Sequence, residues 1–559
     1  MSDVGTLERM FGDPWDPANP LGHAAAVAAD EREEMFGEGE RLLDRFVLNA
    51  EFVPVEYGGR LTGLDRLVRM MRPVWRRDPC LGLGYGASSF IASVNVWTAG
   101  SDEQRRAFAR MMLANRKIAS VYHELAHGND FARAEFAATP GPPGTLLLNG
   151  RKEVVTNAKR ADSLVVFART SPEEGSRSHS QLFVHKEDLP PGRMTDLPRF
   201  RSMGMRGVQL GGLLFEDCPA PADAVLGAPG RGMETALRSF QLTRTALPSM
   251  MVGVLDTGLR TAIRFTSGRA LYGRTAADIP QVRATLAEAF ADLLVCDAFG
   301  TVAARAVHLL PGETSVYASL VKYMVSKLLI EAMDRLSLVL GAQFYIREGE
   351  HAVFQKLLRD LAVIGFGHAA RVACLATVLP QVPQLARRSW PAAAEPPADL
   401  FRPDAELPPL PFDALTAAAS GRESLSTGPG ALLDEHGADP DVRRLAEVFA
   451  RELAALRDEA LALRPRDLGV AATPEALAVP ARLAAVLAAS ACLGVWRHAG
   501  DPFLKDPAWV VAALTRLTAR IGTGDGRLPA PLAERLLSET LTRYADGRAF
   551  DLAGGPIPG

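Results

Sequence analysis

The chain has 559 residues, a formal net charge of -3 and five cysteines, and 48% of its residues are hydrophobic. A chain of this length exceeds one hydrophobic core and predicts about three or four structural units. The nearly balanced charge argues against nucleic-acid binding, and five scattered cysteines argue against a disulfide framework or a bound metal such as zinc. The acidic N-terminus lacks the basic start and apolar run of a signal peptide, so we expect a cytoplasmic protein.

Helix-spaced apolar residues dominate the first region, residues 1–116. The spacing predicts helices over residues 21–50, 64–75, 85–97 and 102–113. Ser101 is the expected N-cap of the last of these helices, because a serine oxygen can accept a hydrogen bond from a free backbone N–H. We therefore expect a helical N-terminal domain.

Residues 117–228 have a different pattern. Short runs of β-branched and aliphatic residues, separated by Pro-Gly and Asn-Gly turns, predict strands at 145–149, 163–168 and 181–185 and in the glycine-rich stretch 203–215. A polar loop with Gly128 and Asp130 precedes them. A small β-domain between two helical blocks indicates a ligand site where the sheet meets the helices.

The chain returns to helical spacing after this β-domain. Residues 229–380 predict a four-helix bundle, with helices over 233–267, 281–309, 313–341 and 352–379 and a weak point at Pro248. Residues 381–411 form a Pro-rich linker. Residues 412–559 predict a C-terminal helical domain, with helices over 441–463, 474–496, 507–521 and 531–544 and a loose tail. The expected fold class is mostly α with a small central β-domain.

Five motifs in this order resemble motifs of the acyl-CoA dehydrogenase family. VYHELAHGND (121–130) resembles the flavin loop TEPGAGSD, and LNGRKEVVTNAKRAD (148–162) resembles LNGxKxWITNxxxAD. The stretch 203–227 resembles the end of the family's β-domain, RALYGR (269–274) resembles RxxFGx, and LVLGAQFY (338–345) followed by LLRD resembles QxxGGxGY…RD. The resemblance covers roughly residues 30–380. The extra C-terminal helices make the chain most similar to the very-long-chain branch.

The resemblance implies an FAD cofactor between the β-domain and the bundle. Thr156 matches the residue at the flavin N5 side, with Lys152 and Asn157 beside it. Arg269 and Tyr272 match contacts to the flavin of a neighbouring subunit, which implies a homodimer. The resemblance also implies an electron-transfer acceptor. The cofactor-binding residues that the resemblance implies are Tyr122, His123, Asn129, Val154, Thr156, Arg269, Tyr272 and Gly341.

Several positions depart from the family pattern. His123 replaces a threonine, Asn129 a serine, Val154 an aromatic residue and Leu338 a glutamine, whereas Glu124 and Asp130 are kept. Asp130 is either a substrate residue or a loop cap. His127 faces either a substrate channel or solvent. Together these changes indicate either a repurposed flavin pocket or one that binds flavin poorly.

The position of the family's catalytic glutamate is also altered. His368 holds that place, followed by Ala369–Ala370, and the alternative position on an earlier helix is Thr243, next to Arg244. A neutral imidazole, with an ordinary pKa of about 6.5, suits proton transfer near neutral pH. The alternative is that His368 only fills space in a loop. Asp130, Thr243 and Arg244 are the candidate substrate residues.

Three functions follow from these residues. The first is an FAD-dependent dehydrogenase of acyl thioesters, carried on coenzyme A or on a carrier protein, with His368 as an atypical base. The second is a flavin-dependent monooxygenase on the same fold, which the missing carboxylate and His123 favour. The third is a degenerate, non-catalytic partner subunit, which the lost aromatic and glutamine contacts favour.

Overall fold

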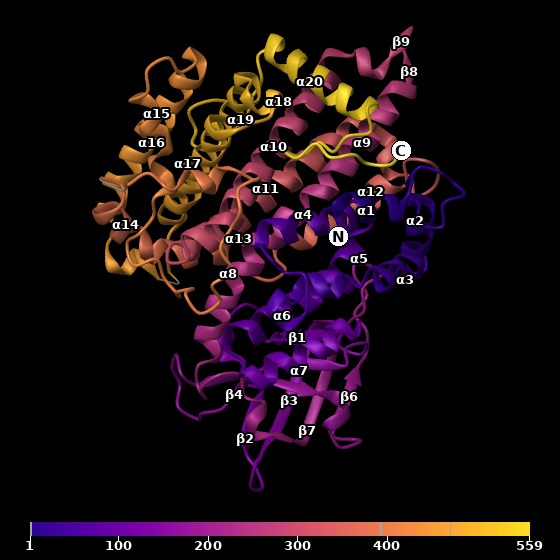
Figure 1. Ribbon diagram of the computed structural model, residues 1–559, viewed down its shortest axis with the longest axis vertical. Helices are drawn as coiled ribbons and strands as arrows, with labels where there is room; N and C mark the ends of the chain where they lie inside the picture. Colours follow the sequence, from indigo (N-terminus) through magenta and orange to yellow (C-terminus); the bar gives the residue numbers. More distant parts are fainter. Residues whose placement is uncertain (1–2, 392–393, 470) are drawn as a thin grey trace. The chain divides into compact units, whose positions relative to one another are not determined.

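The computed structural model describes residues 3–391, 394–469 and 471–559, and the chain forms two compact units. We name them the sheet unit, which contains Ala25–Thr62 and Asp78–Thr243, and the bundle unit, which contains Met1–Ala24, Gly63–Arg77 and Arg244–Gly559. Figure 1 labels most of their helices and strands.

The sheet unit combines short helices with a seven-stranded sheet. Its helices are α3 (Gly37–Phe46), α5 (Pro79–Leu81), α6 (Ser88–Ala99) and α7 (Asp102–Leu113), and most of α2 (His23–Glu31) also belongs to it. Its strands are β1 (Ile118–Val121), β2 (Ala137–Pro140), β3 (Thr145–Thr156), β4 (Ser163–Arg169), β5 (His179–His185), β6 (Met194–Leu197) and β7 (Leu210–Pro221).

The strands are paired in the order β1-β4-β2-β3-β7-β6, and β5 pairs with β4. The long antiparallel pair β3–β7 has two register shifts, at Leu148/Gly150 and at Glu153/Val155. A β-bulge bends a strand and re-aims the side chains beside it. The second shift lies immediately before Thr156, so the local bend sets the direction of a predicted site residue.

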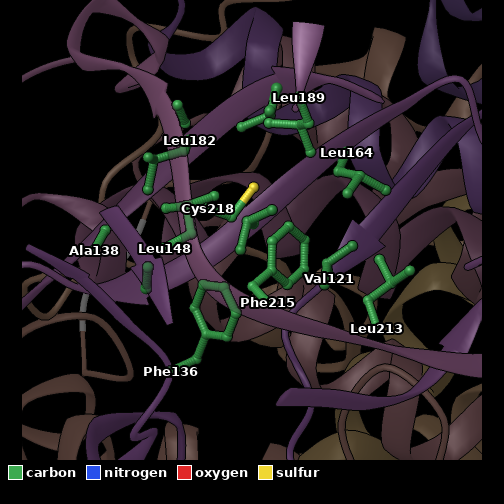
Figure 2. Packing of buried hydrophobic residues seen from close by; sticks show 14 of the residues in the cluster. Val121, Phe136, Ala138, Leu148, Leu164, Leu182, Leu189, Leu213, Phe215 and Cys218 are labelled. Carbon is green, nitrogen blue, oxygen red and sulfur yellow. The ribbon is translucent and has the colours of Figure 1, made fainter. Parts of the chain in front are cut away.

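One face of the sheet packs into an apolar core. Figure 2 shows this cluster, in which the rings of Phe136 and Phe215 meet edge to face at 5.3 Å between centroids. Leu148, Leu164 and Leu213 are fully buried around them. This burial makes the sheet a rigid base for the loops at its edge.

The predictions for this unit were correct for most elements. The helix at 102–113 is confirmed as α7, and Ser101 and Gln104 form a reciprocal capping box at its start. The single helix predicted over 21–50 was wrong, because a turn in which Glu33 has φ 56° separates α2 from α3. The strand predicted within 203–215 begins only at Leu210.

Long helices build the bundle unit, together with part of α8 (Gly232–Met250), which continues from the sheet unit. The unit contains α1 (Val4–Phe11), α4 (Leu64–Arg77), α9 (Val252–Gly268), α10 (Pro280–Leu309), α11 (Thr314–Leu340), α12 (Val353–Leu361), α13 (Arg371–Val378), α14 (Val382–Arg388), α15 (Gly428–Leu433), α16 (Pro440–Ala462), α17 (Pro474–His498), α18 (Pro502–Lys505), α19 (Pro507–Thr518) and α20 (Ala530–Ala545), with the hairpin β8 (Ala270–Leu271) and β9 (Arg274–Thr275).

Helix α10 is central, because it packs against α9, α11, α17, α19 and α20. Helix α17 is long and apolar enough to cross a membrane by length and composition, but 78% of its most apolar stretch is buried inside the protein, as for a core helix. The helix predicted over 352–379 was wrong, because residues 362–370 separate α12 from α13. The region predicted as an extended linker begins with the helix α14.

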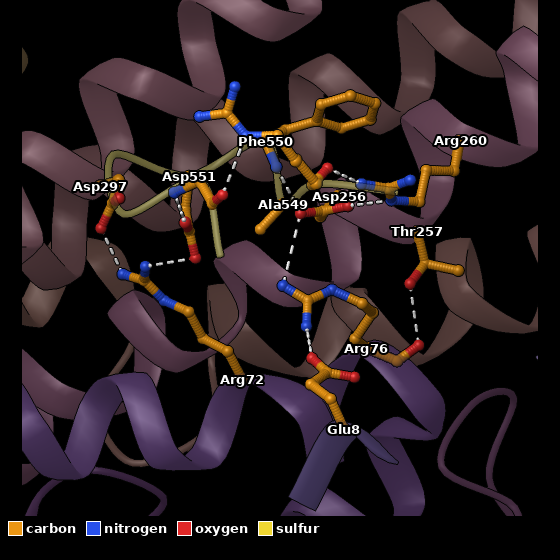
Figure 3. Close-up of polar contacts among 12 residues, drawn as sticks. Glu8, Arg72, Arg76, Asp256, Thr257, Arg260, Asp297, Ala549, Phe550 and Asp551 are labelled. Carbon is orange, nitrogen blue, oxygen red and sulfur yellow. Dashed lines mark hydrogen bonds and ion pairs between the residues drawn. The ribbon is translucent and has the colours of Figure 1, made fainter. Parts of the chain in front are cut away.

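The tail that was predicted to be loose, residues 553–559, is anchored, because Ile557 is buried and its backbone N–H donates to the Gly547 carbonyl at 2.7 Å. The residues just before it are held as well. Figure 3 shows Asp551 beside Arg72, with Asp551 Oδ2 2.9 Å from Arg72 Nη1. The backbone N–H of Phe550 donates to Asp256 Oδ2 at 2.9 Å, and Phe550 is fully buried. The sequence does not predict this anchoring, because the acids and arginines that form it are far apart in the chain.

Candidate functional site

The loop that follows β1 begins with Tyr122, whose side chain points into the core of the sheet unit. Its hydroxyl donates a hydrogen bond to Asn95 Oδ1 at 2.9 Å, and its ring stacks on Phe167 with centroids 5.2 Å apart. Phe131 and Phe240 pack against the same ring. Because the side chain is enclosed in this way, Tyr122 can reach a cofactor only through its main chain.

Glu124 and Lys152 form a buried ion pair next to Tyr122. Lys152 Nζ donates to Glu124 Oε1 at 2.7 Å and to the Tyr122 carbonyl at 3.0 Å, and Lys152 is 0% exposed. Burial lowers the pKa of Lys152 to about 8, although Glu124 opposes this shift. Burial would raise the pKa of Glu124, but Lys152 and two backbone N–H groups hold it below its usual value.

Two histidines lie in the same loop. The ring of His123 meets Phe131 edge to face at 5.4 Å, and burial, with Lys152 adding to it, lowers the pKa of His123 below its ordinary value. His127 Nε2 lies 3.8 Å from a Glu124 oxygen and 3.6 Å from Glu135 Oε1. His127, whose direction the sequence left open, therefore lies against these acids.

The tip of the loop is exposed to solvent. Asn129 and Asp130 are both exposed, and Asp130 Oδ2 is 3.6 Å from Arg133 Nε. The Asp130 side chain does not cap the short helix at Phe131–Arg133. The structure thus places the two residues away from the buried Lys152 and at the accessible side of the loop.

Val154 and Thr156 mark the accessible edge of β3. Val154 has φ 57°, a conformation that costs a β-branched residue energy, and its side chain is 37% exposed. The Thr156 hydroxyl is half-buried and makes no side-chain hydrogen bond within the part of the chain that the structure describes. Asn157, by contrast, is fully buried and its Nδ2 donates to Ser88 Oγ at 2.9 Å.

These residues fit the edge of a flavin. A flat ring with polar edges needs hydrogen-bond partners along one side and apolar contacts on its face. Among the described residues, the Thr156 hydroxyl has no side-chain hydrogen bond and can serve as a partner, and the main chain from Tyr122 to Glu124 is held in place. The side chains of Val154 and Leu125 are exposed. Leu125 lies beside β3, because its N–H donates to Glu153 Oε2 at 3.3 Å. Asn157, by holding the turn after β3, supports this edge.

The bundle unit carries the candidate base. His368 lies between α12 and α13, and both His368 and Ala369 have positive φ, at 56° and 100°. Phe366 in the same loop is 64% exposed, whereas His368 is half-buried. Two consecutive non-glycine residues in this backbone region are strained, and such strain is concentrated at functional sites.

Positive charge surrounds the start of this loop. Lys322 Nζ, on α11, donates to the Ile364 carbonyl at 2.8 Å, and Arg244 Nη1 lies 3.5 Å from Ser319 Oγ. Burial lowers the pKa of Lys322 to about 8. Cys374 opposes this shift, whereas Arg244 and Arg371 add to it. Burial also lowers the pKa of Arg244. Sequence reasoning missed Lys322, although a lone lysine within the apolar stripe of a helix is a usable signal.

Thr243 is fully buried on α8, and its hydroxyl donates to the Phe240 carbonyl at 3.2 Å. This bond stays within the helix and satisfies the hydroxyl locally. Thr243 offers no carboxylate, so His368 is the better candidate for a base.

The remaining cofactor candidates lie on the surface of the bundle unit. Arg269 caps the end of α9 just before β8, and Tyr272 lies in the turn between β8 and β9, where it is 92% exposed with φ 51°. Gly341 ends α11 with φ 57° and is exposed, and Leu338 just before it is 79% exposed.

Two family profiles match the chain: the acyl-CoA dehydrogenase middle domain over residues 120–218 and the acyl-CoA dehydrogenase C-terminal domain over residues 230–368. A probable acyl-CoA dehydrogenase of Mycobacterium tuberculosis is 30% identical over 269 residues, which cover 48% of this chain and 67% of that protein. The chain belongs to the acyl-CoA dehydrogenase family.

Solved structures agree on the fold. The acyl-CoA dehydrogenase of Bacillus anthracis, solved with FAD, covers 97% of this chain and 94% of its own at a TM-score of 0.72 and 17% identity. A prolyl acyl carrier protein oxidase covers 66% of this chain and 95% of its own at a TM-score of 0.58 and 17% identity. By its family, the chain is an FAD-dependent oxidoreductase.

Proposed function

We propose that the protein is an acyl-thioester α,β-dehydrogenase in which His368 is the base. When bound, FAD supplies the oxidising power by accepting the hydride that leaves the β-carbon. The chain itself must then remove the α-proton, and His368 Nδ1 or Nε2 takes it. Because the family position of the glutamate is occupied by His368, this assignment needs a neutral imidazole.

The observation that carries this proposal is the strained backbone at His368 and Ala369. A loop that only fills space has no reason to keep two non-glycine residues at positive φ, whereas a catalytic loop must aim one side chain. Lys322 holds the turn before this loop through its bond to the Ile364 carbonyl.

Anaerobic reduction of the flavin by an acyl thioester tests this function. We expect the visible absorbance of the purified, FAD-loaded protein to bleach when an acyl-CoA is added without oxygen. His368→Ala should abolish bleaching, and His368→Glu should restore part of it, because a carboxylate also accepts the proton. If His368→Ala is bleached at the wild-type rate, His368 is not the base.

The same experiment separates the other two functions. Oxygen-dependent turnover of reduced flavin without anaerobic bleaching supports the monooxygenase. A purified protein that takes up FAD but shows neither reaction supports the non-catalytic subunit. The exposed Val154 edge, where the resemblance expects an aromatic residue, is the observation that favours this last reading.

The carrier of the acyl group is the second part of the proposal. Coenzyme A is the carrier named for the family, and the fold similarity to a prolyl acyl carrier protein oxidase supports a carrier protein as the alternative. Bleaching rates with the same acyl group on each carrier decide between them. An electron-transfer protein is the expected acceptor that reoxidises the flavin.

The proposal includes a homodimer and the very-long-chain branch. Tyr272, Leu338 and Tyr345 are 92%, 79% and 82% exposed, which supports a surface covered by a second subunit. The similarity to the Bacillus anthracis structure over 97% of this chain supports the branch with extra C-terminal helices. Light scattering of the purified protein tests the dimer, and the rate of bleaching as a function of acyl-chain length tests the branch.

A further inference from the structure

The loop from Glu124 to Phe136 is closed at its neck by one carboxylate. Glu124 Oε2 accepts the N–H of Glu135 at 2.8 Å, and Glu124 Oε1 accepts the N–H of Phe136 at 3.1 Å. His179, the first residue of β5, donates from its Nε2 to the Ala134 carbonyl at 3.0 Å. A surface loop whose two ends meet in this way is an Ω-loop, a class that often carries function.

Lys152 holds this neck from the strand beside it. Its ammonium contacts the Glu124 carboxylate at 2.7 Å and the Tyr122 carbonyl at 3.0 Å, and it faces the rings of Phe136 at 5.2 Å and Phe167 at 5.9 Å. A buried charge persists only when it is paired, and losing one partner is costly. The Glu124 carboxylate therefore depends on Lys152 to remain ionised in the interior.

Lys152 also connects the two segments that face the flavin in the proposed function. It lies on β3, four residues before Thr156, and the next N–H, of Glu153, donates to the His123 carbonyl at 3.0 Å. The end of β1 and the edge of β3 are thus joined at Lys152 and Glu153. A displacement of one segment is transmitted to the other.

We infer that Lys152 is a positioning residue for the flavin, which fixes the main chain from Tyr122 to Glu124 and the neck of the Ω-loop through Glu124. This inference rests on the proposed function, because that function makes the two segments the flavin-binding edge. Lys152 does not itself need to touch the cofactor. Its effect is on the affinity for FAD and on how that affinity depends on pH.

The pH dependence follows from the groups around the ammonium. Glu124 faces it as an anion, His123 and His179 are titratable neighbours, and Arg169 is a further cation close to His179. With a pKa of about 8, lowered by burial, Lys152 loses its proton as the pH rises through 8. The charge-assisted bonds to Glu124 and to the Tyr122 carbonyl then weaken, so we expect FAD affinity to fall.

The stability of the fold changes in the opposite direction. An unfolded lysine keeps its proton up to a pKa of about 10.4. Between pH 8 and that value the unfolded chain binds more protons than the folded chain, so this group makes the free energy of unfolding rise with pH. The titration of Lys152 therefore contributes opposite pH trends to FAD affinity and to the free energy of unfolding, and circular dichroism at each pH separates the two.

The test is FAD titration of the apoprotein, followed by flavin fluorescence, at pH 7, 8 and 9. We expect the dissociation constant of wild type to rise severalfold between pH 7 and pH 9, and that of Lys152→Met to be raised about tenfold already at pH 7, as for loss of a charge-assisted hydrogen bond. Lys152→Arg keeps its charge throughout and should show no inflection near pH 8. Arg151→Met is the matched control, because Arg151 is the exposed neighbour on the same strand and should behave as wild type.

Two results would overturn the inference: Lys152→Met that binds FAD as tightly as wild type, or Lys152→Arg with the wild-type inflection. If Lys152→Met does not fold, as judged by circular dichroism, the pH series of Lys152→Arg alone decides. A wild type that binds FAD with this pH dependence but is not bleached by acyl thioesters contradicts the proposed dehydrogenase and leaves the positioning role of Lys152 intact.

Discussion

Two groups of buried cations in the bundle unit differ in what surrounds them. The first, which we name the tail cluster, contains Glu8, Arg72, Arg76, Asp256, Arg260, Asp297 and Asp551 (Figure 3). The second, the base-loop cations, contains the buried Arg244 and Lys322 and the half-buried Arg371, and Cys374 favours the charge of the first two.

Burial acts on both groups, but the outcome is opposite. In the tail cluster burial opposes the charge of Arg72, yet Asp297 and Asp551 raise its pKa above the usual value. At the base loop the pKa values of Arg244 and Lys322 are lowered. Matched buried charges serve the fold, whereas charges kept at an energetic disadvantage indicate a functional site. This difference separates the anchor of the tail from the neighbourhood of His368.

The largest expected effect is at the tail cluster. Arg72→Met leaves Asp297 and Asp551 buried without their cation and should lower the free energy of unfolding by about 3–5 kcal/mol, measured by urea denaturation. Arg69→Met is the control, since Arg69 is partly exposed and its contact with Asp65 is 3.4 Å, and it should cost less than about 1 kcal/mol. Equal losses for the two variants would contradict the structural role of the cluster.

At the base loop we expect a substitution to lower activity without lowering the free energy of unfolding. Lys322→Met removes a charge that is disfavoured by burial, so the urea midpoint should stay the same or rise. The hydrogen bond to the Ile364 carbonyl is lost, and the anaerobic bleaching rate should fall about tenfold, which corresponds to ~1.4 kcal/mol. Lys327→Met on the same helix is the control and should leave both unchanged. A destabilised Lys322→Met with unaltered bleaching would place Lys322 with the structural charges.

The smallest expected effect concerns backbone strain in the sheet unit. Val154→Gly removes the cost of φ 57° for a β-branched residue and should raise the free energy of unfolding by about 1 kcal/mol. The FAD dissociation constant should not improve, because the bend that aims Thr156 is no longer enforced. Val155→Gly, at a buried position with ordinary φ, should destabilise by more than about 1 kcal/mol. A destabilised Val154→Gly would show that position 154 carries no strain.

Sequence patterns predicted the elements that local rules decide. Helix α7 has its expected bounds because a serine cap and a regular apolar stripe act over neighbouring residues. The family and the FAD cofactor followed from five ordered motifs. The domain boundaries and the roles of the individual site residues stay predictions.

The errors have two physical causes, local backbone conformations that the residue types do not predict and contacts between residues far apart in the chain. The break at 362–370 includes His368 and Ala369, which both have positive φ. Histidine and alanine rarely adopt this conformation, so their presence in the sequence does not predict it. The ion pairs of Asp551 and the bond of Lys322 join residues far apart in the chain. Tertiary contacts between distant residues are invisible to a window of neighbouring residues, and the site depends on them.

The tail cluster also constrains the order in which the chain can be assembled. Arg76 forms an ion pair with Glu8 of α1, and Arg72, one turn earlier on α4, forms an ion pair with Asp551 near the C-terminus. Helix α4 thus binds both an early and a late stretch of the chain. During synthesis Arg72 and Asp297 leave the ribosome long before Asp551 does. Until residue 551 has emerged, Arg72 has Asp297 as a carboxylate partner and lacks the second, so the anchor of the tail is completed only late in synthesis.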